Sequence, residues 1–309
     1  MTEFKVRELA TGLRFPEGPI AMPDGSVILV EIARGTLTRV TSGGKVEVIA
    51  DLGGGPNGAA LGPDNCVYVC NNGGFTWHEA DGHLFTDGSP SADYKGGSIQ
   101  RVNLSSGKVE TLYTECDGQG FGGPNDIVFD GKGGFYFTDL GKVIDGKLLL
   151  GGLYYGREDG SSVKRMAYPL QLANGVGLSP DGRTVYVAQT YTGWLVKWTV
   201  NGPGEVAPSS SAIPGDLVGK SEGRSLFDSL AIEANGNICV ATIDNPKGGI
   251  TTFTPDGGIN RVSFDDPAVT NICFGGKDMK TAFLTLSGHG RLIAVDWPRP
   301  GLQLPYQEV

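Results

Sequence analysis

Short apolar runs recur along the chain, each separated from the next by a turn of glycine, proline, aspartate or asparagine. A typical unit contains the apolar triplet Ile127-Val128-Phe129, a turn at residues 130–134 and the run Phe135-Tyr136-Phe137-Thr138. Short runs rich in aromatic and β-branched residues, bounded by turn residues, predict β-strands. The i, i+3, i+4, i+7 spacing of an amphipathic helix is almost absent.

This unit occurs six times, and further strand-like runs follow each copy. Repeats of about 40–50 residues with four short strands each are typical of a β-propeller, because a single blade cannot bury both of its faces. We therefore predict an all-β fold, a six-bladed β-propeller with four-stranded antiparallel blades around a central channel. No linker or change in composition interrupts the repeats, so residues 1–309 are expected to form one domain.

Each unit opens with a polar residue, here called an anchor. The six anchors are Glu17, Asn57, Asn125, Asn174, Asp228 and Asn271. Equivalent positions of successive blades surround the channel of a propeller, so the anchors should converge at one mouth. All six are carboxylates or carboxamides, and hard oxygen ligands with two negative charges suit Ca²⁺ first, then Mg²⁺ or Mn²⁺, and Zn²⁺ less well. The sequence therefore predicts one divalent cation in the channel.

Asn and Asp before a strand also form Asx turns, which is a purely structural role. Recurrence in all six units favours a functional ring, while for Asn57 and Asn271 the structural interpretation stays open. Asp126 and Asp139 both belong to the third unit. We expect them to form turns or to hold the anchors in place rather than to bind a second metal ion.

Charge and composition restrict the partners. The formal net charge of −9 argues against nucleic acid and anionic membranes, which would repel the protein. No apolar run approaches the roughly 18–20 residues of a membrane span, and the N-terminus has no apolar signal region. The five cysteines form no CxxC motif and are expected to be buried thiols. We expect a cytoplasmic protein, monomeric or weakly homo-oligomeric, that acts on a small molecule.

The long loop of the second unit is the best candidate for a substrate wall, because loops beyond about a dozen residues usually have a function. The expected substrate-binding residues are Asn72, Phe75, Trp77, Phe121 and Tyr191. Together with Tyr94, the aromatic residues of this set would form an apolar lid over an apolar or planar substrate. Alternatively, these aromatic side chains cover a blade edge. The three histidines, His78, His83 and His289, are expected in loops. The side chain of His289, in Ser287-Gly288-His289-Gly290, could also reach the pocket.

The motifs FPEGP, GGPNDIVFD, FYFTD, ANGVGLSPDG and WPRPG resemble the SMP-30/gluconolactonase/luciferin-regenerating-enzyme family, from Phe15 to Trp297. This resemblance implies a six-bladed propeller whose channel cation is held by Glu17, Asn125, Asn174 and Asp228, with Asp228 as base or nucleophile. One position departs from the family pattern. Animal gluconolactonases have an Arg two residues before the channel Asn that contacts sugar hydroxyls, and Gly123 occupies that position here.

The resulting hypothesis is metal-assisted hydrolysis of a lactone, in which a bound cation polarises the carbonyl and Asp228 activates water or attacks directly. Two alternatives remain open. A phosphotriesterase of the diisopropylfluorophosphatase type, or another hydrolase or lyase, would use the same metal site. A non-catalytic propeller would bind a ligand or a protein around a structural cation. Ser229 lacks a G-x-S-x-G motif, so no serine-hydrolase scheme is required.

Overall fold

The computed structural model describes residues 4–209 and 214–308, in which the regular elements are 29 β-strands. These ranges contain no helix, and hence none long and apolar enough to cross a membrane. Residues 1–3, part of the N-terminal stretch in which no signal region is expected, lie outside the described residues. The prediction of an all-β protein is confirmed.

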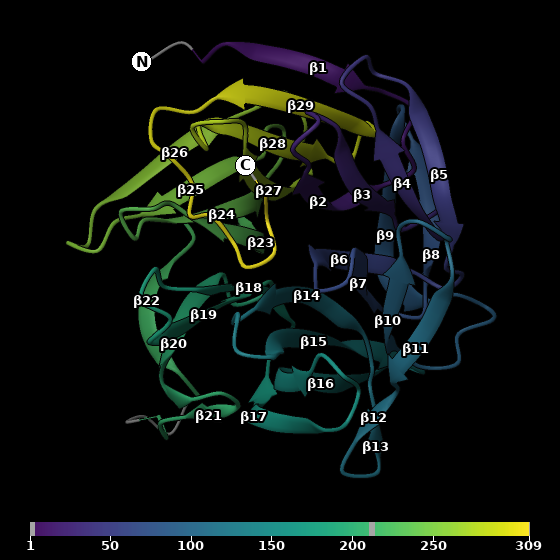
Figure 1. Cartoon of the computed structure of the whole chain (residues 1–309), viewed down its shortest axis with the longest axis vertical. Helices are drawn as coiled ribbons and strands as arrows, with labels where there is room; N and C mark the ends of the chain where they lie inside the picture. Colours follow the sequence, from purple (N-terminus) through teal and green to yellow (C-terminus); the bar gives the residue numbers. More distant parts are fainter. Residues whose placement is uncertain (1–3, 210–213, 309) are drawn as a thin grey trace.

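Six sheets surround a central axis as the blades of a propeller (Figure 1), as predicted. The innermost strands carry the anchors and are β2 (Pro16–Ala21), β6 (Pro56–Leu61), β14 (Pro124–Phe129), β18 (Ala173–Leu178), β23 (Leu226–Ile232) and β27 (Val269–Gly275). Each innermost strand contacts that of the next blade, and β27 contacts β2. The ring of inner strands is therefore closed.

The remaining strands follow in order from the axis outwards, and all pair antiparallel. The second strands are β3 (Val27–Glu31), β7 (Cys66–Asn71), β15 (Gly134–Ile144), β19 (Thr184–Gln189), β24 (Ile238–Ile243) and β28 (Thr281–Leu286). The third strands are β4 (Thr36–Val40), β10 (Ser98–Asn103), β16 (Lys147–Arg157), β20 (Trp194–Gly202), β25 (Gly249–Phe253) and β29 (Arg291–Asp296). The outermost strands are β5 (Val46–Asp51), β11 (Val109–Tyr113), β17 (Val163–Leu170), β22 (Asp216–Lys220), β26 (Ile259–Ser263) and β1 (Val6–Ala10).

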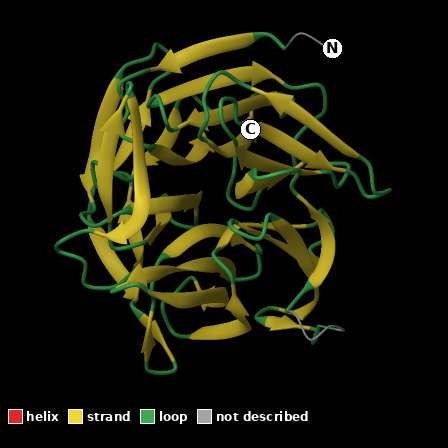
Figure 2. Ribbon diagram, turned by 180° about the vertical axis from the view of Figure 1, so that it is seen from behind, coloured by secondary structure: helices red, strands yellow, loops and turns green. Residues whose placement is uncertain are grey.

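The outermost strand of the sixth blade comes from the beginning of the chain. β1 pairs with β29, with Val6 opposite Val295 and Glu8 opposite Ile293. The first and last strands of the chain thus lie side by side in one sheet (Figure 2) and close the ring of blades. The repeat pattern did not predict this pairing, because it joins segments that are far apart in the sequence.

Three short elements depart from the four-stranded plan. β8 (Phe75–Ala80) and β9 (His83–Pro90) form a separate hairpin inserted between β7 and β10. A second small hairpin, β12 (Glu115–Cys116) and β13 (Gln119–Gly120), follows β11. In the fourth blade β21 (Glu205–Val206) pairs with the far end of β20 as a fifth strand. The β8–β9 hairpin lies in the long loop that the sequence singles out as a substrate wall.

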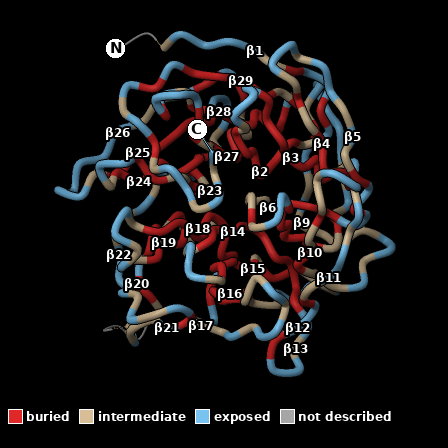
Figure 3. Tube along the Cα trace, viewed as in Figure 1, coloured by how far each residue is buried: buried red, intermediate tan, exposed pale blue. Residues whose placement is uncertain are grey.

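The core lies between neighbouring blades, so the inner strands are buried and the outer strands are exposed (Figure 3). Between the second and third blades it is aromatic. The Tyr68 and Phe129 rings meet edge to face with centroids 5.0 Å apart, and Phe137 stacks on Tyr154 at 5.2 Å. Such pairs stabilise by about 0.5–1.5 kcal/mol beyond the burial of their area. All five cysteines are free thiols; four are buried, and Cys273 is partly buried.

Glycines next to three anchors let adjacent blades approach closely at the axis. A Cβ on Gly18 would lie 2.6 Å from Ala59 N, and one on Gly58 would lie 2.4 Å from Asn125 O. A Cβ on Gly175 would lie 2.7 Å from Asp228 O. These neighbours are backbone atoms, which cannot rotate away. The innermost strands therefore meet at distances that only glycine permits.

We expect Gly175→Ala to destabilise the protein by about 1–3 kcal/mol, the usual cost of overpacking a filled site. The added methyl group would meet the backbone of residues 228–230 below 3.0 Å. Gly43→Ala is the matched control, since the nearest atom to its Cβ is Thr41 Oγ1 at 3.9 Å and its φ is not positive. Urea unfolding measures both. Equal stability of the two variants would contradict this account of the axis.

Candidate functional site

A one-residue irregularity positions the anchor in every blade. In the third blade Pro124 is opposite Asp139 but Ile127 is opposite Phe137, so β14 holds one residue more than β15 over this stretch. The same register shift occurs at the anchor of each innermost strand. A β-bulge bends the strand and redirects a side chain, and bulges are frequent beside active sites. The bulge therefore redirects the anchor side chain at the equivalent position of each of the six blades.

Five of the six anchors are buried, with exposed fractions of 2–6 %. Asp228 alone is only partly buried. The exposed fraction is 2 % for both Glu17 and Asn125, and 5 % for Asn174. Asp228 is therefore the least buried of the six anchors.

Glu17 is held by donors from the ring itself. Asn271 donates from Nδ2 to Glu17 Oε2 at 2.7 Å, and Gly18 N donates to the same oxygen at 2.9 Å. Burial nevertheless raises the pKa of Glu17, while these hydrogen bonds act in the opposite direction. Asn271 thus orients a carboxylate, which agrees with the structural interpretation that the sequence left open for it.

The charges of neighbouring acids add to burial at Asp228 and Asp126. Burial, and then the charge of Glu17, raise the pKa of Asp228 well above its ordinary value, while a hydrogen bond with Asn174 lowers it. Burial raises the pKa of Asp126 to about 7, although Ile127 N at 2.9 Å and Val176 N at 3.1 Å donate to its carboxylate. Asp126 therefore braces the ring between the third and fourth blades.

Asn125 and Asn174 each add a carboxamide oxygen from the innermost strand of their blade. Asn125 Oδ1 is buried and has no hydrogen-bond partner among the described residues. Asn174 donates from Nδ2 to Thr190 Oγ1 at 3.1 Å, which turns its Oδ1 inward, where Ser229 Oγ lies 3.5 Å away. An orphaned buried oxygen beside acids that repel one another fits a cation bound by Glu17, Asn125, Asn174 and Asp228.

Within residues 4–209 and 214–308, no group of three or more His, Cys, Asp or Glu side chains is arranged to hold a metal ion. The expected set contains only two such side chains, because two of its four ligands are asparagines. Oxygen-only sets with carboxamides suit Ca²⁺ or Mg²⁺ rather than Zn²⁺.

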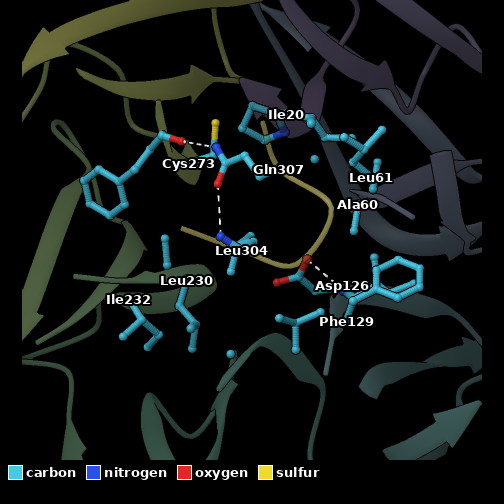
Figure 4. A pocket seen from close by; sticks show the side chains of 18 of the residues that line it. Ile20, Ala60, Leu61, Asp126, Phe129, Leu230, Ile232, Cys273, Leu304 and Gln307 are labelled. Carbon is cyan, nitrogen blue, oxygen red and sulfur yellow. Dashed lines mark hydrogen bonds between the residues drawn. The ribbon is translucent and has the colours of Figure 1, made fainter. Parts of the chain in front are cut away.

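A cavity runs from the anchor ring along the axis and is lined by the innermost strands. Its walls are apolar, with Ile20, Leu61, Leu230 and Ile232 facing inward and Asp126 as the acidic group (Figure 4). The C-terminal segment crosses its far end, where Gln307 Nε2 donates to Phe274 O at 2.8 Å and Leu302 N donates to Ile232 O at 2.8 Å. The anchors and the C-terminal segment thus lie at opposite ends of the cavity.

The expected substrate-binding residues fall into different environments. Phe75 and Trp77 lie on β8, and Trp77 packs against Phe15, just before Glu17, with ring centroids 4.9 Å apart. Tyr191 is 64 % exposed. Phe121, in contrast, is buried in the aromatic core, where its ring meets that of Phe137. Phe75 and Trp77 therefore lie on the hairpin that contacts Phe15, whereas the Phe121 ring lies inside the core between the second and third blades.

Asn72 is buried just after β7, between two glycines that precede anchors. A Cβ on Gly55 would lie 2.3 Å from Asn72 Oδ1, and one on Gly123 would lie 3.6 Å from Asn72 Cβ. A Cβ on Gly123 would also meet Gly141 O at 2.7 Å. Any side chain at position 123, including an Arg, therefore requires the backbone to move, which explains the glycine there.

Lys142 was missed by the sequence analysis. It lies on the extension of β15 beside the anchor side and is 2 % exposed, and Nζ donates to Asn72 O at 2.9 Å. Burial lowers the pKa of Lys142 to about 7, against the charge of Asp139, which raises it. The run Leu140-Gly141-Lys142-Val143 looks like a solvated hairpin in the sequence, so no local signal marks a buried lysine.

The histidines lie at the rim rather than among the anchors. His83 Nε2 is 2.7 Å from His289 Nε2, and His289 Nδ1 is 2.8 Å from the buried carboxylate of Asp266. With Leu84 N donating to Gly288 O at 2.9 Å, these contacts attach the β8–β9 hairpin to the sixth blade. His78 pairs with Asp87 at 3.4 Å within the hairpin.

A family model described as an SMP-30/gluconolactonase/LRE-like region matches residues 15–288. The chain belongs to this family. Among curated proteins, lactonase drp35 of Staphylococcus saprophyticus is 31 % identical over 227 residues, which is 72 % of this chain and 62 % of that protein. The chain thus spans less than two thirds of the length of this relative.

Solved structures share the propeller fold. A gluconolactonase from Xanthomonas campestris superposes with a TM-score of 0.74 at 20 % identity, covering 96 % of this chain and 91 % of that one. The calcium-binding protein regucalcin from Agrobacterium tumefaciens superposes with a TM-score of 0.67 at 18 % identity, covering 97 % and 98 %. The expected resemblance to the SMP-30/gluconolactonase family is confirmed.

We expect Asp126→Asn to make the stability of the metal-free protein less dependent on pH. A buried acid with a raised pKa stabilises the folded state while protonated, so this contribution is complete below about pH 4 and is lost as pH rises through about 7. The wild type should lose on the order of a few kcal/mol more than the variant across this interval.

Urea unfolding in a chelator at several pH values measures this difference. Asp93→Asn, a change at an exposed acid, is the control and should follow the wild type. Parallel pH profiles of wild type and Asp126→Asn would show that Asp126 is ionised in the folded protein throughout.

Proposed function

We propose that the protein is a lactonase that depends on one divalent cation at the anchor ring. The observation that carries the proposal is the ring of oxygen donors, in which the charge of Glu17 raises the pKa of Asp126 and Asp228 and Asn125 Oδ1 has no partner among the described residues. Membership of the SMP-30/gluconolactonase family and similarity to lactonase drp35 support a cyclic ester as the substrate.

Glu17, Asn125, Asn174 and Asp228 would hold the cation. Ca²⁺ is the first choice because every donor is a hard oxygen, with Mg²⁺, Mn²⁺ or Zn²⁺ as alternatives, and the calcium-binding regucalcin shares the fold. When bound, the cation would supply an electrophile for the ester carbonyl and stabilise negative charge on its oxygen. With Glu17 and Asp228 ionised and the two carboxamides neutral, the formal charge of the loaded site would be zero.

The chain's own groups have separate roles in this proposal. Asp228, the partly exposed anchor, takes a proton from water or attacks the carbonyl carbon. Glu17 is kept in place by Asn271 and Gly18 N, and Asn174 by Thr190. Phe75 and Trp77 form an apolar wall beside the mouth and exclude water from one side of the ring.

A same-fold phosphotriesterase and a non-catalytic binding propeller remain as competing proposals. A panel of aldono-, aliphatic and aromatic lactones assayed beside phosphotriesters distinguishes them. Hydrolysis of phosphotriesters but not of lactones would favour the first alternative. Absence of turnover on every substrate, with a cation still bound, would favour the second.

We expect Asp228→Asn to reduce kcat on any lactone that the wild type hydrolyses by at least about 100-fold, the range associated with loss of a base. The fold should survive, because the change keeps the shape of the side chain and removes a charge that Glu17 and Asp126 repel. Steady-state kinetics and circular dichroism measure the two properties. Asp93→Asn, with the same chemical change at an exposed site, is the control. Full activity of Asp228→Asn would contradict the assigned role.

We expect Ca²⁺ to stabilise the chelator-treated wild type, by about 2.7 kcal/mol at 100 times its Kd. Glu17→Gln removes one of the two anionic ligands and should weaken binding by at least 10-fold. Calorimetric titration and thermal unfolding with added cation give affinity and stabilisation. Glu79→Gln, on the exposed part of the β8–β9 hairpin, is the matched control. No binding of any divalent cation near neutral pH would disprove the metal site.

A further inference from the structure

Lys142 is a buried ammonium beside the anchor side of the second and third blades. Its Nζ lies 3.7 Å from the centroid of the Phe75 ring and 5.1 Å from that of Tyr94. Such contacts stabilise a cation by about 0.5–2 kcal/mol, but they do not neutralise it. Long charged side chains are rarely buried unless they are paired. With a pKa lowered to about 7 the amine is only partly protonated near neutral pH, and an anionic partner would hold it in the charged form.

The described residues supply no ionic partner for Lys142. Among them, the ammonium has one hydrogen-bond acceptor, Asn72 O, for its three N–H groups. Asp139 acts on its charge, yet the Asp139 carboxylate is already occupied by the backbone N–H groups of Gly122, Gly123 and Gly141 at 2.7–2.9 Å. Asp139 thus shapes the loop and leaves the ammonium without an ion pair.

Asn72 adds a second unused donor next to this ammonium. Its Oδ1 accepts from Gly74 N at 2.8 Å, whereas its buried Nδ2 has no acceptor among the described residues. The Asn72 side chain lies between Gly55 and Gly123, and each of these glycines stands two residues before an anchor. Lys142 Nζ donates to the backbone oxygen of this same Asn72, so the two residues with unused donors are in contact near the start of the second and third innermost strands.

We propose that Lys142 and Asn72 bind a carboxylate of the substrate, so that the preferred substrate is a lactone that carries a free carboxylate beside its ring. This inference rests on the proposed lactonase function and narrows its substrate class. A neutral acceptor would satisfy the N–H groups but leave the charge unpaired, whereas a carboxylate does both. Its two oxygens match two donors, and its single negative charge matches one ammonium. Phe75, which is partly exposed, forms the outer wall.

In this arrangement the proposed cation and the Lys142 ammonium would contact opposite ends of one substrate. The cation at the ring would face the ester, and Lys142 would face the carboxylate. Ring opening by water breaks the bond between the acyl carbon and the ring oxygen, forms an acid and an alcohol, and releases one proton. The product is a dicarboxylate, with one negative charge near each positive group.

The test compares γ-valerolactone with its analogue in which a carboxylate replaces the methyl group. We expect the wild type to prefer the charged lactone, and Lys142→Met to lower the ratio of the two kcat/KM values by at least 10-fold, mainly through KM. Lys142→Arg, which keeps the charge, should retain part of the preference. Lys147→Met, at an exposed position of the same hairpin, is the control. An unchanged ratio in Lys142→Met, or a wild-type preference for γ-valerolactone, would overturn the proposal.

Binding of the ring-opened dicarboxylate, measured by calorimetry on the Ca²⁺-loaded protein, separates this inference from the proposed function. If the wild type hydrolyses neither lactone, the lactonase proposal fails for this class. Binding at least 10-fold weaker in Lys142→Met would then still support the carboxylate site. Equal binding by the two proteins would overturn it. Thermal unfolding confirms that each variant is folded.

Discussion

The close meeting of six innermost strands at one axis is the constraint on which the rest of the structure depends. Glycines after three anchors, Gly18, Gly58 and Gly175, remove the side chains that would hold neighbouring blades apart. A bulge in every innermost strand then turns the anchor at that point. Close approach and repeated geometry together gather polar side chains from segments more than 200 residues apart.

This gathering has an electrostatic cost. Burial raises the pKa of Glu17, Asp126 and Asp228, the charge of Glu17 raises that of the two aspartates further, and the charge of Asp126 adds to the effect at Asp228. Stability alone would favour apolar residues at the axis, as in the far part of the cavity. The presence of acids where they repel one another is the basis of the proposed cation site.

The fold and the anchors were predictable because their signals are local: turn residues, short apolar runs and a polar residue at a fixed place in each repeat. The pairing of β1 with β29 was not, because the chain ends carry no mark of each other. Phe121 follows a long loop and reads as a lid residue, but three-dimensional packing buries it against Phe137. Lys142 is a charged residue in a hairpin, and only the fold reveals that Phe75 covers it.

β1 closes the sixth blade by pairing with β29, and this strand can detach while the other strands of the propeller stay paired. The first three residues of β1 are already exposed, so detachment of this strand would expose little additional apolar surface to solvent. Local unfolding of such a segment takes less free energy than global unfolding. Its release would leave β29 as an unpaired edge, the kind of surface on which strands of other chains add. The residues that complete the propeller thus also protect it from association through its edge.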